Sequence, residues 1–265
     1  MSRLANKSIV IIGGTTGLGL SAARRFSAEG ASVVVVGRNP DSAEAAEKAL
    51  GERGLAFVGD AAEPTTAEAA IVLAVEKFGG FHGLYHVAGG SGRKFGDGPL
   101  HEITDEGWQA TLDLNLTSLF NSNRAAVRRF LKQGQGGTLL NMGSVLGWSP
   151  SPAFFSTHAY ATTKAAIVGL TKAGAAYYAT HNIRFNVLAP ALVATPMSRR
   201  AQENDDLLDF IRTKQPLDGG RIGVPEDLDS AAVFFLSDES RFVTGQVLAV
   251  DGGWTVSEGQ LPEQR

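Results

Sequence analysis

The stretch IVIIGGTTGLG, Ile9 to Gly19, places a loop rich in glycine directly after four consecutive apolar residues. A short, continuous apolar run that ends in glycine is typical of a strand covered on both faces. Leu20, Ala23 and Phe26 then recur at the spacing of one helix face. This order of strand, glycine loop and helix predicts the first unit of a parallel α/β sheet.

More apolar runs follow along the chain, separated by segments with helical spacing such as Ile71, Val75 and Phe78. These runs are VVVV (33–36), AFV (56–58), LYHVA (84–88), TLLNM (138–142), RFNVLA (184–189) and VLAV (247–250). Their alternation with helical segments predicts a doubly wound parallel sheet of about seven strands with helices on both faces. No linker or composition shift divides the chain, so we predict one domain over residues 1–265.

Composition fits one well-buried core and narrows the function. Of 265 residues, 43% are hydrophobic and 19% are charged, which suits a globular domain. The formal net charge is −3 without a basic patch, which argues against nucleic acid as a partner. The absence of cysteine excludes disulfides and thiolate catalysis. The first apolar run is too short for a signal peptide or a membrane span, so we expect a cytoplasmic protein without a membrane partner.

The glycines of GGTTGLG have the spacing G-x-x-x-G-x-G. Glycine lets the backbone turn tightly and approach a pyrophosphate, which then meets the positive end of the following helix. Glycine turns after strands are frequent, but this one lies between an expected buried strand and an expected helix. We therefore expect a dinucleotide at this loop, in contact with Gly13, Thr15, Thr16, Gly17, Leu18 and Gly19.

The end of the second expected strand, VVVVGRNP, bears on the choice of dinucleotide. An acidic residue at this point binds the ribose hydroxyls of NAD, whereas an arginine accepts the 2′-phosphate of NADP. Gly37 stands where that carboxylate is needed and Arg38 follows, which favours NADP and leaves NAD open. The alternative is that Arg38 is only a solvated loop cation. Asp60, followed by Ala61, is expected at the adenine amino group or as a helix cap.

A second pattern consists of residues that could act together as an acid and a base. Tyr160 and Lys164 are four residues apart, and Ser144 precedes the tyrosine by sixteen residues. Residues four apart share one helix face, so an ammonium at 164 favours the tyrosinate at 160 and gives a usable acid and base. Such pairs are also common helix-surface neighbours, so the pair alone does not decide the function.

The glycine loop, the serine and the Y-x-x-x-K pair, in this order, resemble the short-chain dehydrogenase/reductase family. The resemblance extends from Lys7 to Gly253 and includes Asn115 in LDLNLTSLF and the segment RFNVLAPALVATP. It implies a Rossmann-like fold, an oxidoreductase with a nicotinamide cofactor and no metal, and a homotetramer, with a dimer as second choice. The small residues of the helices expected at about 106–131 and 158–180 suit packing against partner subunits.

The resemblance also implies a role for each matched residue. Tyr160 is the general acid in reduction and the base in oxidation, and Ser144 hydrogen-bonds the substrate oxygen. Lys164 lowers the tyrosine pKa and binds the nicotinamide ribose, and Asn115 holds a water that links Lys164 to solvent. Further cofactor contacts are implied at Val87, Gly89, Val193 and Thr195. The alternatives are that Asn115 caps or bridges helices and that Thr195 is an ordinary turn residue.

Four positions depart from the family pattern. Ile12 stands for a threonine, and His86 and Val87 replace two asparagines of the N-N-A-G turn. Ala191 replaces the glycine that usually follows Pro190. We expect altered bracing near the adenosine pocket, but no group that moves a proton or a hydride is lost. His86 itself is expected to be a structural histidine.

Three segments are expected around the substrate. WSPSPAFFSTH (148–158) and GGSGRKFGDGPL (89–100) are interpreted as walls of an apolar pocket. Arg93 and Lys94 either attract an acidic substrate or lie in a solvated loop. Residues 196–220 form a charged insertion after the sixth expected strand and are interpreted as a substrate lid, with a plain surface insertion as the alternative.

Together these patterns favour an NADP-dependent oxidoreductase that transfers a hydride between nicotinamide and a small-molecule carbonyl or secondary alcohol. One alternative is an NAD-dependent sugar or steroid-type alcohol dehydrogenase. Another is a catalytically silent nucleotide-binding regulator. The complete set of Asn115, Ser144, Tyr160 and Lys164 argues against the regulator, because a scaffold does not need all of these residues.

Overall fold

A parallel sheet in the order β3-β2-β1-β4-β5-β6-β7 forms the centre of the computed structural model, which describes residues 2–260. Every neighbouring pair in this sheet is parallel. The strands are β1 Ser8–Ile12, β2 Ser32–Gly37, β3 Gly54–Val58, β4 Gly83–His86, β5 Gly137–Met142, β6 Ile183–Pro190 and β7 Val247–Val250. The predicted doubly wound parallel sheet is thus confirmed, and the order reverses direction between β1 and β4.

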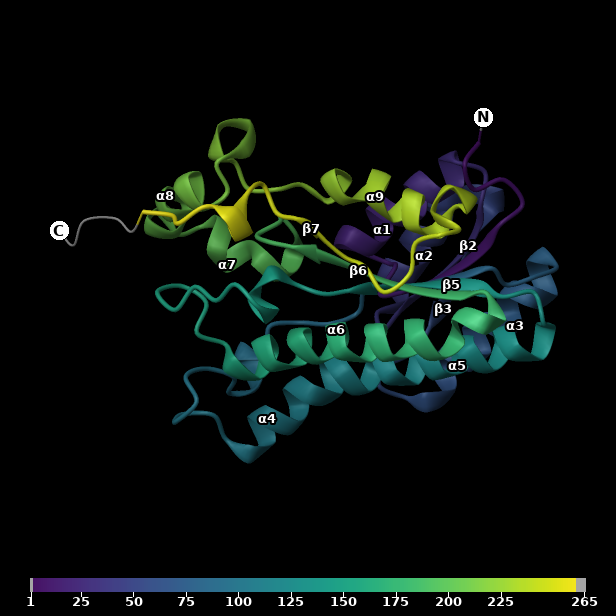
Figure 1. Cartoon of the computed structure of the whole chain (residues 1–265), viewed down its shortest axis with the longest axis horizontal. Helices are drawn as coiled ribbons and strands as arrows, with labels where there is room; N and C mark the ends of the chain where they lie inside the picture. The colour runs from purple at the N-terminus through teal and green to yellow at the C-terminus, as the bar shows by residue number, and fades with distance from the viewer. Residues whose placement is uncertain (1, 261–265) are drawn as a thin grey trace.

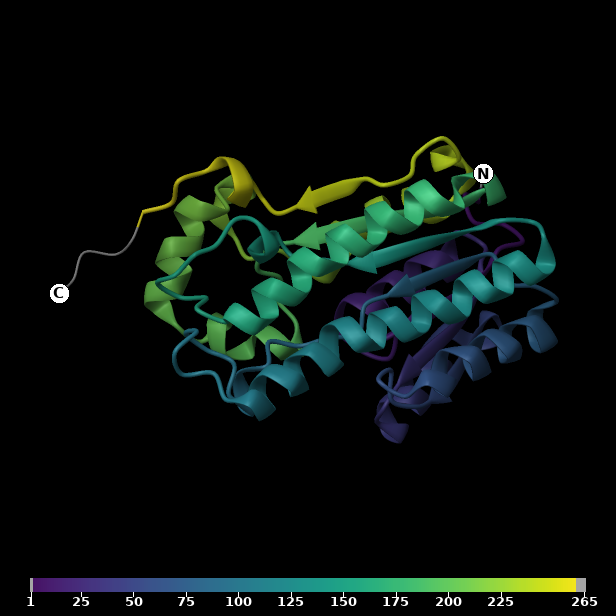
Figure 2. The same cartoon turned by 60° about the horizontal axis from the view of Figure 1, so that its bottom comes forward.

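Helices cover both faces of the sheet, as the alternating pattern predicted (Figure 1). Figure 2 shows α3, α5 and α6 along one face, while α1, α2 and α9 cover the other. The α-helices are α1 Gly17–Ala28, α2 Pro40–Leu50, α3 Pro64–Phe78, α4 Asp105–Leu112, α5 Ser118–Gln133, α6 His158–Tyr178, α7 Arg199–Gln202, α8 Asp205–Lys214 and α9 Asp229–Leu236.

The first strand shows why its sequence is continuously apolar. All five residues of β1 are buried, because successive side chains enter opposite layers. Ile9 and Ile11 belong to the core under α1 and α9, whereas Val10 and Ile12 belong to the core under α3 and α5. Burial of an apolar side chain of this size stabilises a fold by about 1.5–3 kcal/mol, so both layers are anchored on the same strand.

The helix expected at about 106–131 is divided in the structure. A π-helical turn at Asp113–Thr117 separates α4 from α5. Such turns are rare and recur at functional sites. Asn115 is completely buried inside this turn, so the irregularity coincides with a residue singled out by its motif.

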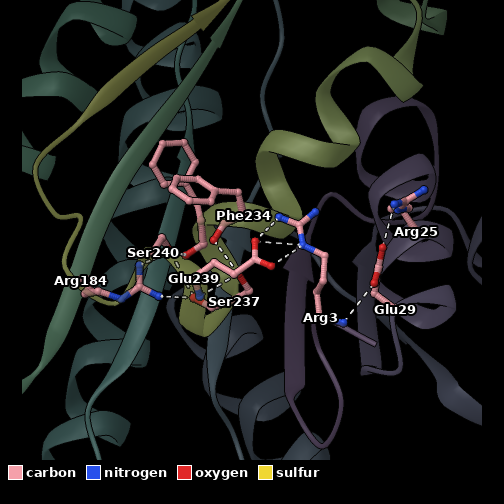
Figure 3. Close-up of polar contacts among 9 residues, drawn as sticks. Arg3, Arg25, Glu29, Arg184, Phe234, Ser237, Glu239 and Ser240 are labelled. Atoms are coloured by element: carbon pink, nitrogen blue, oxygen red, sulfur yellow. Dashed lines mark hydrogen bonds and ion pairs between the residues drawn. The ribbon is translucent and has the colours of Figure 1, made fainter. Parts of the chain in front are cut away.

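The amino-terminal end of the sheet is closed by polar contacts far from the glycine loop (Figure 3). The Arg3 guanidinium donates through Nε to both carboxylate oxygens of Glu239, at 3.1 and 3.0 Å. Arg184, at the start of β6, donates to the Ser237 carbonyl at 3.1 Å and to the Ser240 hydroxyl at 2.7 Å. These contacts tie Arg3 and the start of β6 to the segment after α9.

Within residues 2–260, no helix has both the length and the apolar character required to cross a membrane.

Candidate active site

The glycine loop between β1 and α1 is held so closely that side chains are excluded from it. The backbone amides of Gly13 and Gly14 both donate to the Val36 carbonyl of β2, at 2.9 and 3.0 Å. Gly13 has φ +84°, and a Cβ there would lie 2.6 Å from the Ala88 amide nitrogen. A Cβ on Gly19 would overlap the Gly13 carbonyl oxygen. The loop therefore requires glycine both for its backbone conformation and for its close approaches.

A cleft of about 510 Å³ opens above this loop and brings together most of the residues predicted to contact the cofactor. The predicted residues that line it are Gly13, Thr15, Thr16, Gly17, Leu18, Arg38, Asp60, Ala61, Val87, Gly89 and Thr195. Its volume, its bare glycine floor and the start of α1 fit a dinucleotide with its pyrophosphate at the helix N-terminus.

Four of the predicted cofactor residues lie outside this lining, namely Gly19, Tyr160, Lys164 and Val193. Gly19 is buried beneath the loop, where it permits the close approach to Gly13. The Val193 side chain is buried in the core with α1 and α9, and its carbonyl accepts a hydrogen bond from the Ser198 hydroxyl at 2.6 Å. The sequence pattern located the segment correctly but did not separate the residues facing the cleft from those supporting it.

The outer end of the cleft carries an exposed pair of opposite charges. The Arg38 Nη1 atom lies 3.7 Å from the Asp60 Oδ2 atom, and both side chains are largely exposed. Such pairs contribute about 0–1 kcal/mol, so the guanidinium is readily available to another anion. Asp60 Oδ1 also accepts from the Ala62 amide at 2.9 Å. This contact lies in the loop before α3, whose N-cap residue is Glu63, so the Asp60 carboxylate does not cap that helix.

A second, smaller cavity of about 120 Å³ contains Ser144 and Tyr160. Phe155 and Trp254 contribute to its apolar wall, so the 148–158 segment does form one side of it. Met197 lines both this cavity and the large cleft. The two cavities therefore meet at the segment that follows β6.

Lys164 lies behind the tyrosine, on the same face of α6. Its Nζ atom is 5.4 Å from the centre of the Tyr160 ring and donates to the Met142 carbonyl at 2.9 Å. The side chain is buried, and this burial lowers the pKa of Lys164 to about 8. The helical spacing thus produces the predicted neighbours, but inside the protein rather than at its surface.

The protonation of Tyr160 differs from the expectation. Burial raises the pKa of the Tyr160 phenol, and the Ser144 hydroxyl acts in the opposite direction. The net shift of the Tyr160 pKa is therefore upward rather than downward as expected, because the cost of burying the phenolate dominates. Tyr160 is therefore a neutral phenol at neutral pH, which is the form required of a proton donor.

Asn115 binds backbone groups on two sides. Its Nδ2 atom donates to the carbonyls of Gly90 and Thr111, each at 2.9 Å, and its Oδ1 atom accepts from the Gly90 amide at 3.0 Å. A Cβ added to Gly89 would lie 3.6 Å from Lys164 Nζ, so this loop runs beside the ammonium. Asn115 thus joins the preceding helical turn to the loop after β4 rather than bridging two helices, and both of its amide hydrogens are already used.

His86 occupies the position of a family asparagine as a buried residue. Its Nδ1 atom lies 2.8 Å from the Ser122 hydroxyl. Burial lowers the pKa of His86 to about 3, with a smaller contribution from the Lys164 charge. The imidazole is neutral at physiological pH, which agrees with a structural role.

Asp97 is a site residue that sequence reasoning missed. Thr157, the N-cap residue of α6, makes no side-chain capping bond. The buried Asp97 carboxylate instead accepts from the amides of Ala159 and Tyr160, at 3.0 and 2.9 Å. It therefore fixes the turn of α6 that carries the tyrosine. The two segments are about sixty residues apart, so no local pattern reveals this contact.

Three comparisons agree with the fold. Residues 13–255 match the model of the family described as enoyl-(acyl carrier protein) reductase. The chain is 34% identical over 256 residues to 2,5-dichloro-2,5-cyclohexadiene-1,4-diol dehydrogenase of Sphingobium indicum, covering 96% of this chain and 99% of the relative. It is 33% identical over 250 residues to 3-oxoacyl-(acyl-carrier-protein) reductase FabG of Chlamydia trachomatis, covering 94% and 98%.

A solved short-chain type dehydrogenase/reductase from Mycobacterium ulcerans superposes with a TM-score of 0.88 at 30% identity, covering 97% of this chain and 92% of that one. The fold and the cleft define a dinucleotide-binding oxidoreductase. The chain belongs to the short-chain dehydrogenase/reductase family, whose members use NAD or NADP.

The capping role of Asp97 generates a stability prediction. Asp97→Ala removes both acceptors at the start of α6 and is expected to cost about 1–2 kcal/mol of the free energy of unfolding. Asp97→Asn keeps one acceptor and is expected to cost less. Denaturant unfolding measures both, with Asp105→Ala, in the exposed first turn of α4, as the matched control. Equal stability of Asp97→Ala and the parent would contradict the capping role.

Proposed function

We propose that this chain is an NADP-dependent oxidoreductase that transfers a hydride between nicotinamide and a carbonyl or secondary alcohol substrate. The observation that carries the proposal is the small cavity shared by Ser144 and Tyr160, which meets the dinucleotide cleft at Met197. The buried Lys164 lies directly behind the tyrosine. A nucleotide-binding regulator has no need of a proton donor at this junction.

In this mechanism the cofactor supplies the hydride for reduction and accepts it in oxidation. In reduction, the carbonyl carbon gains the hydride and the carbonyl oxygen gains the Tyr160 proton, which gives a secondary alcohol. The Ser144 hydroxyl donates a hydrogen bond to the same oxygen and stabilises its developing charge. Oxidation reverses each step, with the tyrosinate as base.

We assign Lys164 and Asn115 to the support of this proton transfer. The Lys164 ammonium favours the transient tyrosinate and donates hydrogen bonds to the nicotinamide ribose. Both amide hydrogens of Asn115 bind carbonyls, so its primary role is to hold Gly90 and the adjoining Gly89 beside Lys164. Within the Asn115 side chain, only the Oδ1 atom is therefore available to bind a water that reprotonates Lys164.

The preference for NADP rests on Arg38 at the rim of the cleft. Its guanidinium is 61% exposed and has only a distant partner in Asp60, so it is free to bind the 2′-phosphate through charge-assisted hydrogen bonds. Gly37 offers no carboxylate to the ribose. A Cβ at Gly37 would overlap the Thr15 hydroxyl, so an acidic residue does not fit there without movement of Thr15.

We further propose that residues 196–220 act as the lid of the substrate cavity. Met197 lies at the junction of the two cavities. Leu207, Phe210 and Ile211 of α8 are buried against Trp254 and Val145, so the segment is more than a surface insertion. In this arrangement α8 is the anchored part, and the turn at Pro196–Ser198 together with α7 is the part that closes.

For the assembly we propose a homotetramer. Exposed apolar side chains of Phe120 and Leu131 on α5 and of Tyr177 on α6 offer contact surface to partner subunits.

Replacement of the tyrosine tests the proposed reaction. Tyr160→Phe keeps the ring but removes the transferable proton, so we expect kcat for ketone reduction to fall about 100-fold or more. The affinity for NADPH is expected to remain nearly unchanged. Absorbance of the reduced cofactor with a panel of ketones gives the rate, and cofactor fluorescence gives the affinity. Undiminished turnover in the variant would remove Tyr160 from its proposed role.

The pKa of Lys164 sets an expected pH dependence. Lys164 is cationic below its pKa of about 8 and neutral above it, while the raised pKa of Tyr160 keeps the phenol protonated. We therefore expect kcat/KM for NADPH, which reports the free enzyme, to fall as the pH rises through about 8. Lys164→Arg, whose charge persists, is expected to lack this decline. A parent profile that stays flat up to the ordinary lysine range near about 10.4 would refute the assignment.

Arg38→Leu tests the choice of cofactor. Loss of a charge-assisted hydrogen bond corresponds to about 1.5–3 kcal/mol, or roughly 10- to 150-fold in affinity. The ratio of kcat/KM for NADPH to that for NADH is expected to fall by this factor. Arg24→Leu, an exposed arginine of α1 outside the cleft lining, is the matched control. A parent enzyme that prefers NADH would overturn the NADP assignment and leave the proton chemistry intact.

A further inference from the structure

The small cavity beside Tyr160 carries charge of one sign. Among the residues that the structure describes, the only charged side chains lining it are Arg93 and Arg200. No aspartate or glutamate of residues 2–260 contributes to that lining. The remainder is mostly apolar, including Val145, Leu192 and Trp254. Within the described part of the chain, the lining of this largely apolar cavity therefore carries two positive charges and no negative charge that balances them.

Arg93 is held in this wall rather than free in solvent. Its Nη2 atom donates to the Phe154 carbonyl at 3.1 Å, and the side chain is half-buried. Burial lowers the pKa of Arg93, the Arg200 charge acts in the same direction, and Asp97 opposes them. Both Asp97 carboxylate oxygens already accept from the start of α6. Arg93 thus remains a partly desolvated cation whose hydrogen-bonding capacity exceeds its contacts.

Arg200 approaches the same cavity from α7. Within residues 2–260 neither Arg200 nor Arg93 has a carboxylate close enough to form a salt bridge. Like charges that face one cavity repel, and an anion between them relieves that repulsion. The neighbouring Arg199 is exposed and does not line the cavity. Lys94 does not line it either; its Nζ atom lies 4.8 Å from the centre of the Phe95 ring.

We infer that the substrate is an oxo carboxylate or hydroxy carboxylate, with its carboxylate bound between Arg93 and Arg200 and its reacting oxygen at Ser144 and Tyr160. This inference rests on the proposed oxidoreductase function and adds the substrate class. The carboxylate stays unchanged while the carbonyl carbon gains the hydride and the carbonyl oxygen gains the tyrosine proton. Guanidinium groups suit this task because their planar donors match a carboxylate.

Matched acids and esters test the substrate class. The probes are pyruvate, acetoacetate and levulinate, in which the ketone and the carboxylate are increasingly far apart. The methyl ester of each acid is tested beside it. We expect the parent to show a higher kcat/KM for at least one acid than for its ester. Arg93→Gln and Arg200→Gln are each expected to lower this acid-to-ester ratio by about 10-fold or more, the range of a lost charge-assisted hydrogen bond. Arg199→Gln, the adjacent exposed arginine, is expected to leave the ratio unchanged.

The outcomes separate this inference from the proposed function. Turnover of the esters at rates equal to or above those of all three acids would overturn the substrate class and leave the oxidoreductase standing. Failure of every acid, ester and neutral ketone to oxidise either NADPH or NADH would overturn the oxidoreductase itself. If Arg93→Gln does not fold, Arg200→Gln decides, because its side chain is exposed. An unchanged ratio in folded Arg200→Gln would refute the arginine assignment.

Discussion

The hydrogen bond from Lys164 Nζ to the Met142 carbonyl links α6, which carries Tyr160, to β5, which ends shortly before Ser144. Met142 ends β5 and Ser144 follows two residues later, while Tyr160 lies one turn before Lys164 on α6. A buried ammonium is costly unless it is paired or hydrogen-bonded, which explains its lowered pKa. This one contact therefore joins α6 to the end of β5, while the burial of the ammonium lowers its pKa.

Buried polar side chains hold the loops around this contact. Asp97 replaces a missing N-cap and fixes the first turn of α6. Asn115, inside a π-helical turn, fastens Gly90 next to the ammonium. Both contacts join segments distant in the sequence, so the site is built by tertiary interactions on a rigid sheet. Residues 196–220 are anchored to the same framework through the packing of α8 against Trp254.

The sequence predicted the parallel sheet and the tight glycine loop well, because both depend on local signals. Continuous apolar runs mark strands covered on both faces, and glycine marks positions such as Gly13 where a side chain has no room. It did not predict the capping by Asp97 or the approach of Arg200 to Arg93, since both bring together segments that are far apart in the sequence. It also reversed the direction of the Tyr160 pKa shift, because burial depends on the whole fold.

The central claim is that a hydride from the cofactor and a proton from Tyr160 meet at one carbonyl group. Its most direct test uses NADPH deuterated at the transferable position, with the ketone or oxo acid that turns over fastest, and mass spectrometry of the alcohol. We expect one deuterium on the carbinol carbon in normal water, with no label on the hydroxyl group. An unlabelled carbinol carbon, or cofactor oxidation without any alcohol product, would contradict it.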